Sequence, residues 1–248
     1  IPKLKTTTKS EPLAEFRLIK NKEELAHIKK AVELTQEVFE NVKAALKQES
    51  WTEKQLARLI RHEGIGIGAE EVSFDPIVAS GPNSAIPHHK PSDRVIKTGE
   101  PVVLDFGFKV NGYCSDFTRT VFLKKAPTDF AKLYEHTHKA YEEAFQKVKS
   151  GMKGKEVDAL ARKELEKQKL SKLFIHSLGH GTGLEVHEHP GVGPYSEGVL
   201  LDGMVFSIEP GVYIKNKGGI RIEDLVYLEN GKAKQFANCS RDIKSNIL

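Results

Sequence analysis

Cysteine is scarce in this 248-residue chain, which contains only Cys114 and Cys239. The two residues form no CxxC motif, and so few cysteines suit a reducing compartment, with one disulfide between them left open. We therefore expect a cytoplasmic protein.

Long apolar runs are also absent. None approaches the roughly 20 residues needed to span a bilayer, and the start of the chain lacks the apolar core of a signal peptide. Neither sign of charge dominates, because 38 basic side chains are interspersed with 34 acidic ones, for a net charge of +4. Only the stretch IPKLKTTTK is locally basic. We expect neither a membrane nor a nucleic acid as a partner.

Apolar residues make up 39% of the sequence, which is enough for one large domain or two fused halves. Asn21 with Glu24 and Thr52 with Gln55 have the spacing of helix-capping pairs. They predict a long helix followed by a shorter one that ends at about Arg61. The segment EVSFDPIVAS then reads as strand.

The same order of helix, helix and strand recurs in the second half. Pro127 and Thr128 open a third predicted helix, SGMKG interrupts the pattern, and KEVDALARKELEKQ predicts a fourth helix. We expect an α+β fold with two pseudo-symmetric halves over residues 18–248. Residues 1–17 contain lysines, threonines and prolines, and we expect them to form a linker.

The segment HSLGHGTGLEVHEHP, residues 176–190, holds four of the ten histidines in the chain. Burying several imidazoles together costs free energy unless a metal or a hydrogen-bond network uses their nitrogens. A solvated polar loop is the alternative interpretation. Matching ligands elsewhere in the chain would favour a metal site.

Two acidic residues lie in a predicted hairpin over residues 102–122, whose turn is Asn111-Gly112. A two-residue turn there places Gly107 opposite Asp116, so that Asp116 shares a sheet face with Asp105. Like charges at that separation repel unless a cation lies between them. A solvated hairpin face is the less favoured alternative, because apolar residues line both faces of these strands.

A second predicted hairpin, VFSIEPGVYI and GIRIEDLVYL around the turn KNKG, carries two more acids. Pairing Ile214 with Gly218 places Glu209 opposite Glu223. An even slip in register keeps both glutamates on one face, whereas an odd slip separates them. Four carboxylates with an imidazole form a hard, oxygen-rich ligand set, which suits two Mn²⁺ or Co²⁺ ions, or Zn²⁺, better than one structural zinc.

The motifs LDFG, DFTRT, HSLGHGTGLEVHEHP, IEPGVY and RIED occur in this order between residues 18 and 240. In order and spacing the chain resembles the pita-bread metallopeptidases, and among them the prolidases and Xaa-Pro aminopeptidases. The resemblance implies a pita-bread fold, in which the two halves surround a curved antiparallel sheet. Methionine aminopeptidases look similar but place the last two glutamates further apart than Glu209 and Glu223.

The resemblance also implies the roles of individual residues. The ligands of a dinuclear centre, which we expect to hold Mn²⁺, would be Asp105, Asp116, His180, Glu209 and Glu223, with Asp116 and Glu223 bridging. His88 and His187 would handle the substrate, Glu209 would also move a proton, and His176 and Arg221 would be supporting residues.

The implied activity is that of a metal-dependent exopeptidase acting on peptides with proline in the second position. A methionine aminopeptidase-like enzyme and a non-catalytic peptide-binding or protein-binding module are the alternatives. Many prolidases carry an arginine where this chain has Gly191, which favours an aminopeptidase over a strict dipeptidase. The N-terminal domain usual in this family is not recognisable here, so we expect residues 1–17 to be the linker that follows it, and a homodimer is possible.

Overall fold

The computed structural model describes residues 13–48, 50–236 and 238–248. The α-helices are α1 (Ala14–Leu18), α2 (Lys22–Gln48), α3 (Glu53–Gly66), α4 (Thr128–Lys147) and α5 (Gly154–Glu166), and the short 3-10 helices are η1 (Gly81–Ala85), η2 (Ser171–Leu173) and η3 (Ile243–Asn246). The strands are β1 (Glu71–Val72), β2 (Ile77–Ser80), β3 (Pro101–Phe106), β4 (Phe108–Val110), β5 (Tyr113–Cys114), β6 (Phe117–Phe122), β7 (Gly179–Gly181), β8 (Glu188–Val192), β9 (Val205–Ile208), β10 (Gly211–Ile214), β11 (Gly218–Arg221), β12 (Glu223–Glu229) and β13 (Lys232–Gln235).

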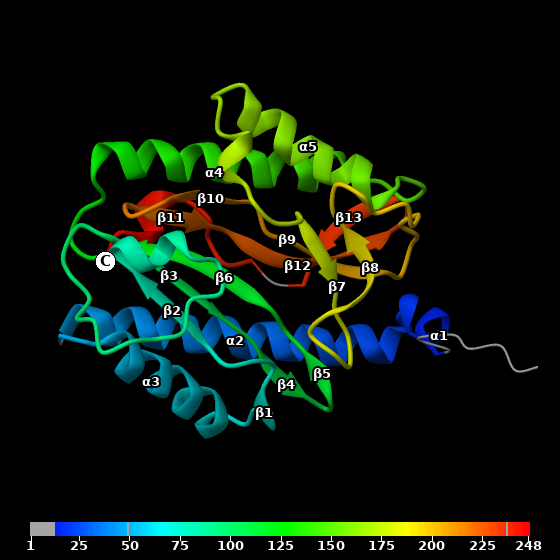
Figure 1. The fold of residues 1–248 in the computed structure, drawn as a ribbon. Coiled ribbons are helices and arrows are strands. Elements are labelled where there is room, and N and C mark those ends of the chain that lie inside the picture. Colours follow the sequence, from blue (N-terminus) through cyan, green and yellow to red (C-terminus); the bar gives the residue numbers. More distant parts are fainter. Residues whose placement is uncertain (1–12, 49, 237) are drawn as a thin grey trace, which may run out of the picture.

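The main sheet has eight strands in the order β2-β3-β6-β12-β9-β7-β8, with β13 paired to β12. All of its strand pairs are antiparallel. Figure 1 shows this sheet between two helix pairs, α2 with α3 on one side and α4 with α5 on the other. The two predicted halves of the α+β fold are therefore present.

Apolar side chains fill the space between each helix pair and the sheet. The cluster under α4 and α5 includes Tyr134, Tyr141, Val157, Leu165 and Phe206. The cluster under α2 and α3 includes Phe39, Val42, Leu56, Ile60 and Phe106. Cys114 and Cys239 are both buried and free, so the disulfide left open by the sequence does not form.

Both predicted capping pairs are confirmed. Asn21 Oδ1 accepts a hydrogen bond from Glu24 N at 3.0 Å, and Glu24 Oε2 accepts one from Asn21 N at 2.8 Å. Thr52 and Gln55 make the same reciprocal pair at the start of α3. The predicted end of α3 near Arg61 is wrong, because the helix continues to Gly66.

Residues 14–17 of the expected linker belong to the short helix α1 (Ala14–Leu18), which contacts β8. Arg17 pairs with Glu188, and Lys20 Nζ lies 2.6 Å from the same carboxylate. Since α1 has no buried residue, these charged contacts attach the segment to β8. Residues 1–12 of the expected linker lie outside the described residues, and the domain boundary stays a prediction.

The two hairpins have the predicted registers. Val110 pairs with Tyr113 and Asp105 pairs with Thr118. Gly107 and Asp116 lie between these two pairs, so the register places them opposite each other. In the second hairpin Ile214 pairs with Gly218, as predicted. The flanking pairs of Gly211 with Arg221 and Ile208 with Asp224 enclose Glu209 and Glu223.

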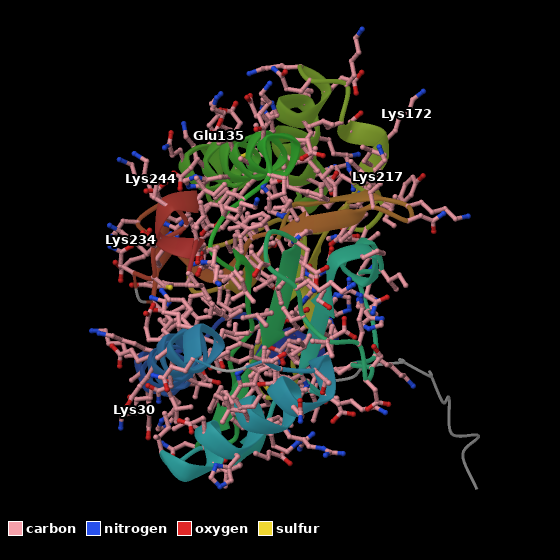
Figure 2. All side chains as sticks on the ribbon, turned by 90° about the vertical axis from the view of Figure 1, so that its left-hand side faces the viewer. Lys30, Glu135, Lys172, Lys217, Lys234 and Lys244 are labelled. Carbon is pink, nitrogen blue, oxygen red and sulfur yellow. The ribbon has the colours of Figure 1, made fainter. Side chains whose placement is uncertain are left out.

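Charged side chains are distributed over many elements. Figure 2 shows the labelled residues at the outer edge of the molecule: Lys30, Glu135, Lys172, Lys217, Lys234 and Lys244. This distribution agrees with the interspersed charges of the sequence. Among the described helices, none has both the length and the apolar character needed to cross a membrane.

Gly64 lies near the end of α3 and gives a test of the packing of this helix. Alanine favours a helix over glycine by about 1 kcal/mol, but a Cβ at Gly64 would overlap the buried ring of Phe108. Since overpacking costs about 1–3 kcal/mol, we expect Gly64→Ala to lower the free energy of unfolding in a urea titration. Gly66→Ala on the same helix has open space around it and should leave stability unchanged or raise it. Stabilisation by Gly64→Ala would contradict this packing.

Candidate metal centre

The five predicted ligands lie on five neighbouring strands of the main sheet or directly beside them. They are Asp105 in β3, Asp116 just before β6, His180 in β7, Glu209 just after β9 and Glu223 at the start of β12. These strands are adjacent in the order β3-β6-β12-β9-β7. Figure 1 shows the strands crossing the middle of the molecule. Pairing between distant segments therefore brings the five side chains together.

A cavity of about 550 Å³ lies over these strands. It is lined by all nine predicted site residues: His88, Asp105, Asp116, His176, His180, His187, Glu209, Arg221 and Glu223. Gly191 also lines this cavity. His88 and His187 are exposed, whereas Asp105, Asp116 and Glu223 are buried. The arrangement places imidazoles at an accessible wall and carboxylates at the base.

Asp116, His180 and Glu223 each offer one ligand atom, and these atoms lie within 4.8 Å of one another. His180 Nε2 is 3.5 Å from Asp116 Oδ2 and 3.4 Å from Glu209 Oε1. Asp105 is not part of the group of three, because its Oδ2 pairs with Arg221. The structure therefore places three ligand atoms around one point, with Glu209 against the same imidazole.

Three carboxylate oxygens in this cavity are buried without a hydrogen-bond partner among the described residues. They are Asp105 Oδ1, Asp116 Oδ1 and Glu223 Oε1. A buried acceptor without a partner is costly, and a carboxylate more so. A divalent cation would give each oxygen a partner, since carboxylates are its preferred ligands. The residues present thus fit metal ions.

The carboxylates raise one another's pKa values. Burial raises the pKa of Asp116 well above its ordinary value, and the charges of Asp105 and Glu209 raise it further. Burial also raises the pKa of Glu223, with Asp116 as the next cause. For Glu209, burial together with Asp105 outweighs the opposing effect of Arg221 and raises the pKa to about 8. A cation bound among these carboxylates would lower their pKa values.

Two neighbouring histidines of the cavity, His180 and His187, have lowered pKa values. Burial, with the nearby His187 as the next cause, lowers the pKa of His180 to about 4. Burial also lowers the pKa of His187, with His88 as the next cause. The ring centroids of His180 and His187 are 4.1 Å apart. A neutral imidazole has a free lone pair for a metal and one N–H to donate.

Arg221 is buried and joins several parts of the site. Its Nη1 donates to Tyr213 Oη at 2.9 Å, and its Nε donates to Thr118 Oγ1 at 3.3 Å. His176 Nε2 lies 2.8 Å from the same Tyr213 hydroxyl. Thr118 Oγ1 in turn donates to Glu223 Oε2 at 2.6 Å. The predicted supporting residues therefore contact ligands directly or through one intermediate.

The sequence reasoning missed Tyr213 and Thr118. Thr118 lies opposite Glu223 across the pair β6 and β12, and nothing local in either hairpin indicates that these strands pair. It also missed Asp158, whose Oδ1 accepts from Leu178 N at 3.0 Å. Asp158 pairs with Arg162, which donates to the carbonyl oxygen of His176. The spacing of four residues in a predicted helix was the available signal.

Without metal, the protein should become more stable as the pH falls. The pKa of Glu209 is raised from its ordinary value of 4.5 to about 8, so the folded chain binds this proton more tightly than the unfolded chain. The stabilisation that comes from protonating Glu209 is absent above about pH 8 and grows as the pH falls toward 4.5. We expect the Tm in a chelator to rise between about pH 9 and about pH 6. Glu209→Gln should make the increase in Tm smaller. A Tm that fell between about pH 9 and about pH 6 would contradict the raised pKa of Glu209.

The sequence matches the metallopeptidase family M24 over residues 26–230. An Xaa-Pro dipeptidase of Pyrococcus furiosus is 40% identical over 233 residues, which are 93% of this chain and 66% of that protein. This chain thus spans just under two thirds of the length of that relative.

Solved structures agree with this relationship. The crystal structure of a prolidase from Thermococcus sibiricus is 44% identical with a TM-score of 0.91, covering 94% of this chain and 64% of that one. That of an X-Pro aminopeptidase from Thermotoga maritima is 36% identical with a TM-score of 0.90, covering 94% and 66%. These likenesses confirm the expected pita-bread fold. The chain belongs to the M24 family of metallopeptidases.

Proposed function

We propose that this chain is the catalytic part of a metal-dependent exopeptidase that hydrolyses the bond between an N-terminal residue and proline. The observation that carries this proposal is the set of partnerless, buried carboxylate oxygens that converge with neutral His180 on one cavity. The names of the relatives, Xaa-Pro dipeptidase and X-Pro aminopeptidase, support the choice of substrate. That the whole protein prefers Xaa-Pro peptides as substrates is part of the same proposal.

The proposed ligands of two divalent ions are Asp105, Asp116, His180, Glu209 and Glu223. Mn²⁺ suits this oxygen-rich set, and Co²⁺ or Zn²⁺ could replace it. When bound, the ions would supply Lewis acidity to the scissile carbonyl and make water a better nucleophile near neutral pH.

The side chains account for the movement of protons. An Xaa-Pro bond is a tertiary amide without an N–H, so its nitrogen must gain a proton to leave as proline. Glu209 faces the cavity and can accept a proton from water and deliver it to this nitrogen. His187 and His88 line the same cavity and can donate a hydrogen bond to the carbonyl oxygen as its charge develops.

The supporting residues keep this arrangement in place. His176 Nδ1 lies 3.9 Å from Glu209 Oε2, and its other ring nitrogen contacts Tyr213. Burial, with Arg221 as the next cause, lowers the pKa of His176 to about 3. The Nδ1 atom of His176 is held by the carbonyl oxygen of Ser177, 2.8 Å away. A neutral His176 therefore adds no positive charge beside Glu209, which leaves that carboxyl group free to exchange a proton.

Two alternatives use the same fold. A non-catalytic binding module is disfavoured by the intact set of five ligands, and a methionine aminopeptidase-like enzyme by the spacing of Glu209 and Glu223. Assays of Met-Xaa and Xaa-Pro peptides in parallel with Mn²⁺ would separate all three. The buried free thiols Cys114 and Cys239 agree with the expected cytoplasmic location. A homodimer stays a prediction for light scattering to test.

The first prediction here concerns the metal ligands. Asp116→Ala removes a carboxylate from the centre of the acidic cluster, so we expect bound metal to be lost and activity to fall by orders of magnitude. His187→Ala should retain its metal but turn over slowly, because His187 faces the substrate. Elemental analysis and steady-state kinetics on both variants provide the measurement. Near-native turnover by Asp116→Ala, or fewer than one ion per chain in the Mn²⁺-loaded parent protein, would refute the dinuclear centre.

The second prediction concerns substrate length. A dipeptide presents its proline carboxylate beside the scissile bond, and Gly191 offers no cation there. The terminal nitrogens of Arg221 are already engaged by Asp105 and Tyr213. A desolvated carboxylate lacking a charge-assisted hydrogen bond loses roughly 1.5–3 kcal/mol.

We therefore expect Xaa-Pro-Xaa to be cleaved with a kcat/KM at least equal to that of the matching Xaa-Pro dipeptide. Kinetics on the two peptides with Mn²⁺ would decide this. A tenfold or larger advantage for the dipeptide would show that another residue replaces the arginine of the prolidases.

A further inference from the structure

His88 lies in the segment 81–92, which contains the short helix η1 but no strand. This segment leaves the main sheet after β2 and runs to the cavity, where His88 is an exposed lining residue. No backbone ladder holds His88 in place. The position of its imidazole therefore depends on the contacts that hold the rest of the segment.

Glu53 at the start of α3 supplies such contacts and is fully buried. Its two carboxylate oxygens accept hydrogen bonds from Ser80 N at 2.8 Å, Ser80 Oγ at 2.7 Å, Asn83 Nδ2 at 3.0 Å, Ser92 N at 3.0 Å and Ser92 Oγ at 2.6 Å, and lie 2.9 Å from His89 Nε2. These partners stand at both ends of the segment and directly after His88. One carboxylate thus ties the entry and the exit of the segment together.

The charge of Glu53 is retained in this environment. Burial raises its pKa, but the hydrogen bonds from Ser92, Ser80, Asn83 and His89 outweigh burial and lower it to about 2. Helix capping does not explain the position of Glu53, because Thr52 and Gln55 already cap α3. The donors that Glu53 collects come from the end of β2 and from the segment, not from its own helix.

The opposite side of the segment is attached to the metal centre. Ser84 Oγ accepts from Gly219 N in β11 at 2.8 Å. The carbonyl oxygen of Pro87, next to His88, accepts from Arg221 Nη1 at 3.3 Å. The segment therefore bridges Glu53 on one side and Arg221 on the other.

We propose that Glu53 is a positioning residue that holds His88 in the cavity by fixing both ends of the segment 81–92. This inference rests on the proposed function, in which His88 contacts the substrate. Glu53 itself does not line the cavity and acts only through the segment.

The test is Glu53→Gln, which keeps the shape of the side chain but replaces one acceptor oxygen by a donating amide. Donors from Ser92 and Asn83 then face a group with fewer lone pairs. We expect kcat on an Xaa-Pro-Xaa peptide with Mn²⁺ to fall roughly 10- to 100-fold, as a misplaced catalytic group does. We expect KM and metal content to change little, and the amides of residues 80–92 to exchange their hydrogens faster.

A double-mutant cycle separates positioning from general destabilisation. If Glu53 acts through His88, adding Glu53→Gln to His88→Ala should lower kcat no further than His88→Ala alone. Ile60→Val is the matched control, since Ile60 is buried in the same helix and makes no polar contact with the segment. It should lower stability slightly and leave kcat and the exchange of residues 80–92 unchanged. Should Glu53→Gln fail to fold, Ser92→Ala removes one hydroxyl donor and enters the same cycle.

Two results would overturn the proposal: a loss from Glu53→Gln that multiplies with the loss from His88→Ala, or unchanged amide exchange over residues 80–92. Failure of the proposed function has a different signature. In that case the unmodified, metal-loaded protein would not cleave Xaa-Pro peptides, whereas the exchange experiment would still show whether Glu53 holds the segment.

Discussion

The mutual repulsion of carboxylates buried in one cavity is the constraint on which the rest of the structure depends. Asp105, Asp116 and Glu223 each lie on the central sheet with an oxygen that has no partner among the described residues. A chain that only needed a stable core would place apolar side chains there, because burying like charges disfavours folding. The arrangement makes sense if cations complete it, so that the same acids that weaken the metal-free fold create the site.

The surrounding structure holds the ligands against this repulsion. Arg221 is the one cation that reaches into the cluster from the described residues that line the cavity, and it pairs with Asp105. The second helix of each half contributes a buried carboxylate to the loops around the cavity. Glu53 of α3 collects the segment that carries His88, and Asp158 of α5 binds the backbone between His176 and His180. The pseudo-symmetry of the fold thus supports both sides of the cavity in the same way.

The sequence was sufficient for the hairpins and insufficient for their assembly. The turn Asn111-Gly112 sets the register of the first hairpin, which places Asp105 and Asp116 on one face without tertiary information. The pairing of β6 with β12, which brings Thr118 to Glu223, joins residues 105 positions apart and has no local signal. The predicted end of α3 was wrong for a related reason. Glycine has a low helix propensity, which favours an early end, but in the structure Gly64 packs against Phe108 of a distant strand.

The neighbourhood of the site extends beyond the part of the chain that matches the family. Glu188 directly follows His187, and its side chain is 8% exposed, so its charge needs a partner. Both partners, Arg17 and Lys20, precede residue 26, where the family match begins. Removing both cations would leave an unpaired buried charge next to a proposed substrate-binding histidine, and such a loss is strongly destabilising. The segment before α2 is therefore attached to β8, the strand that also carries Gly191 of the cavity.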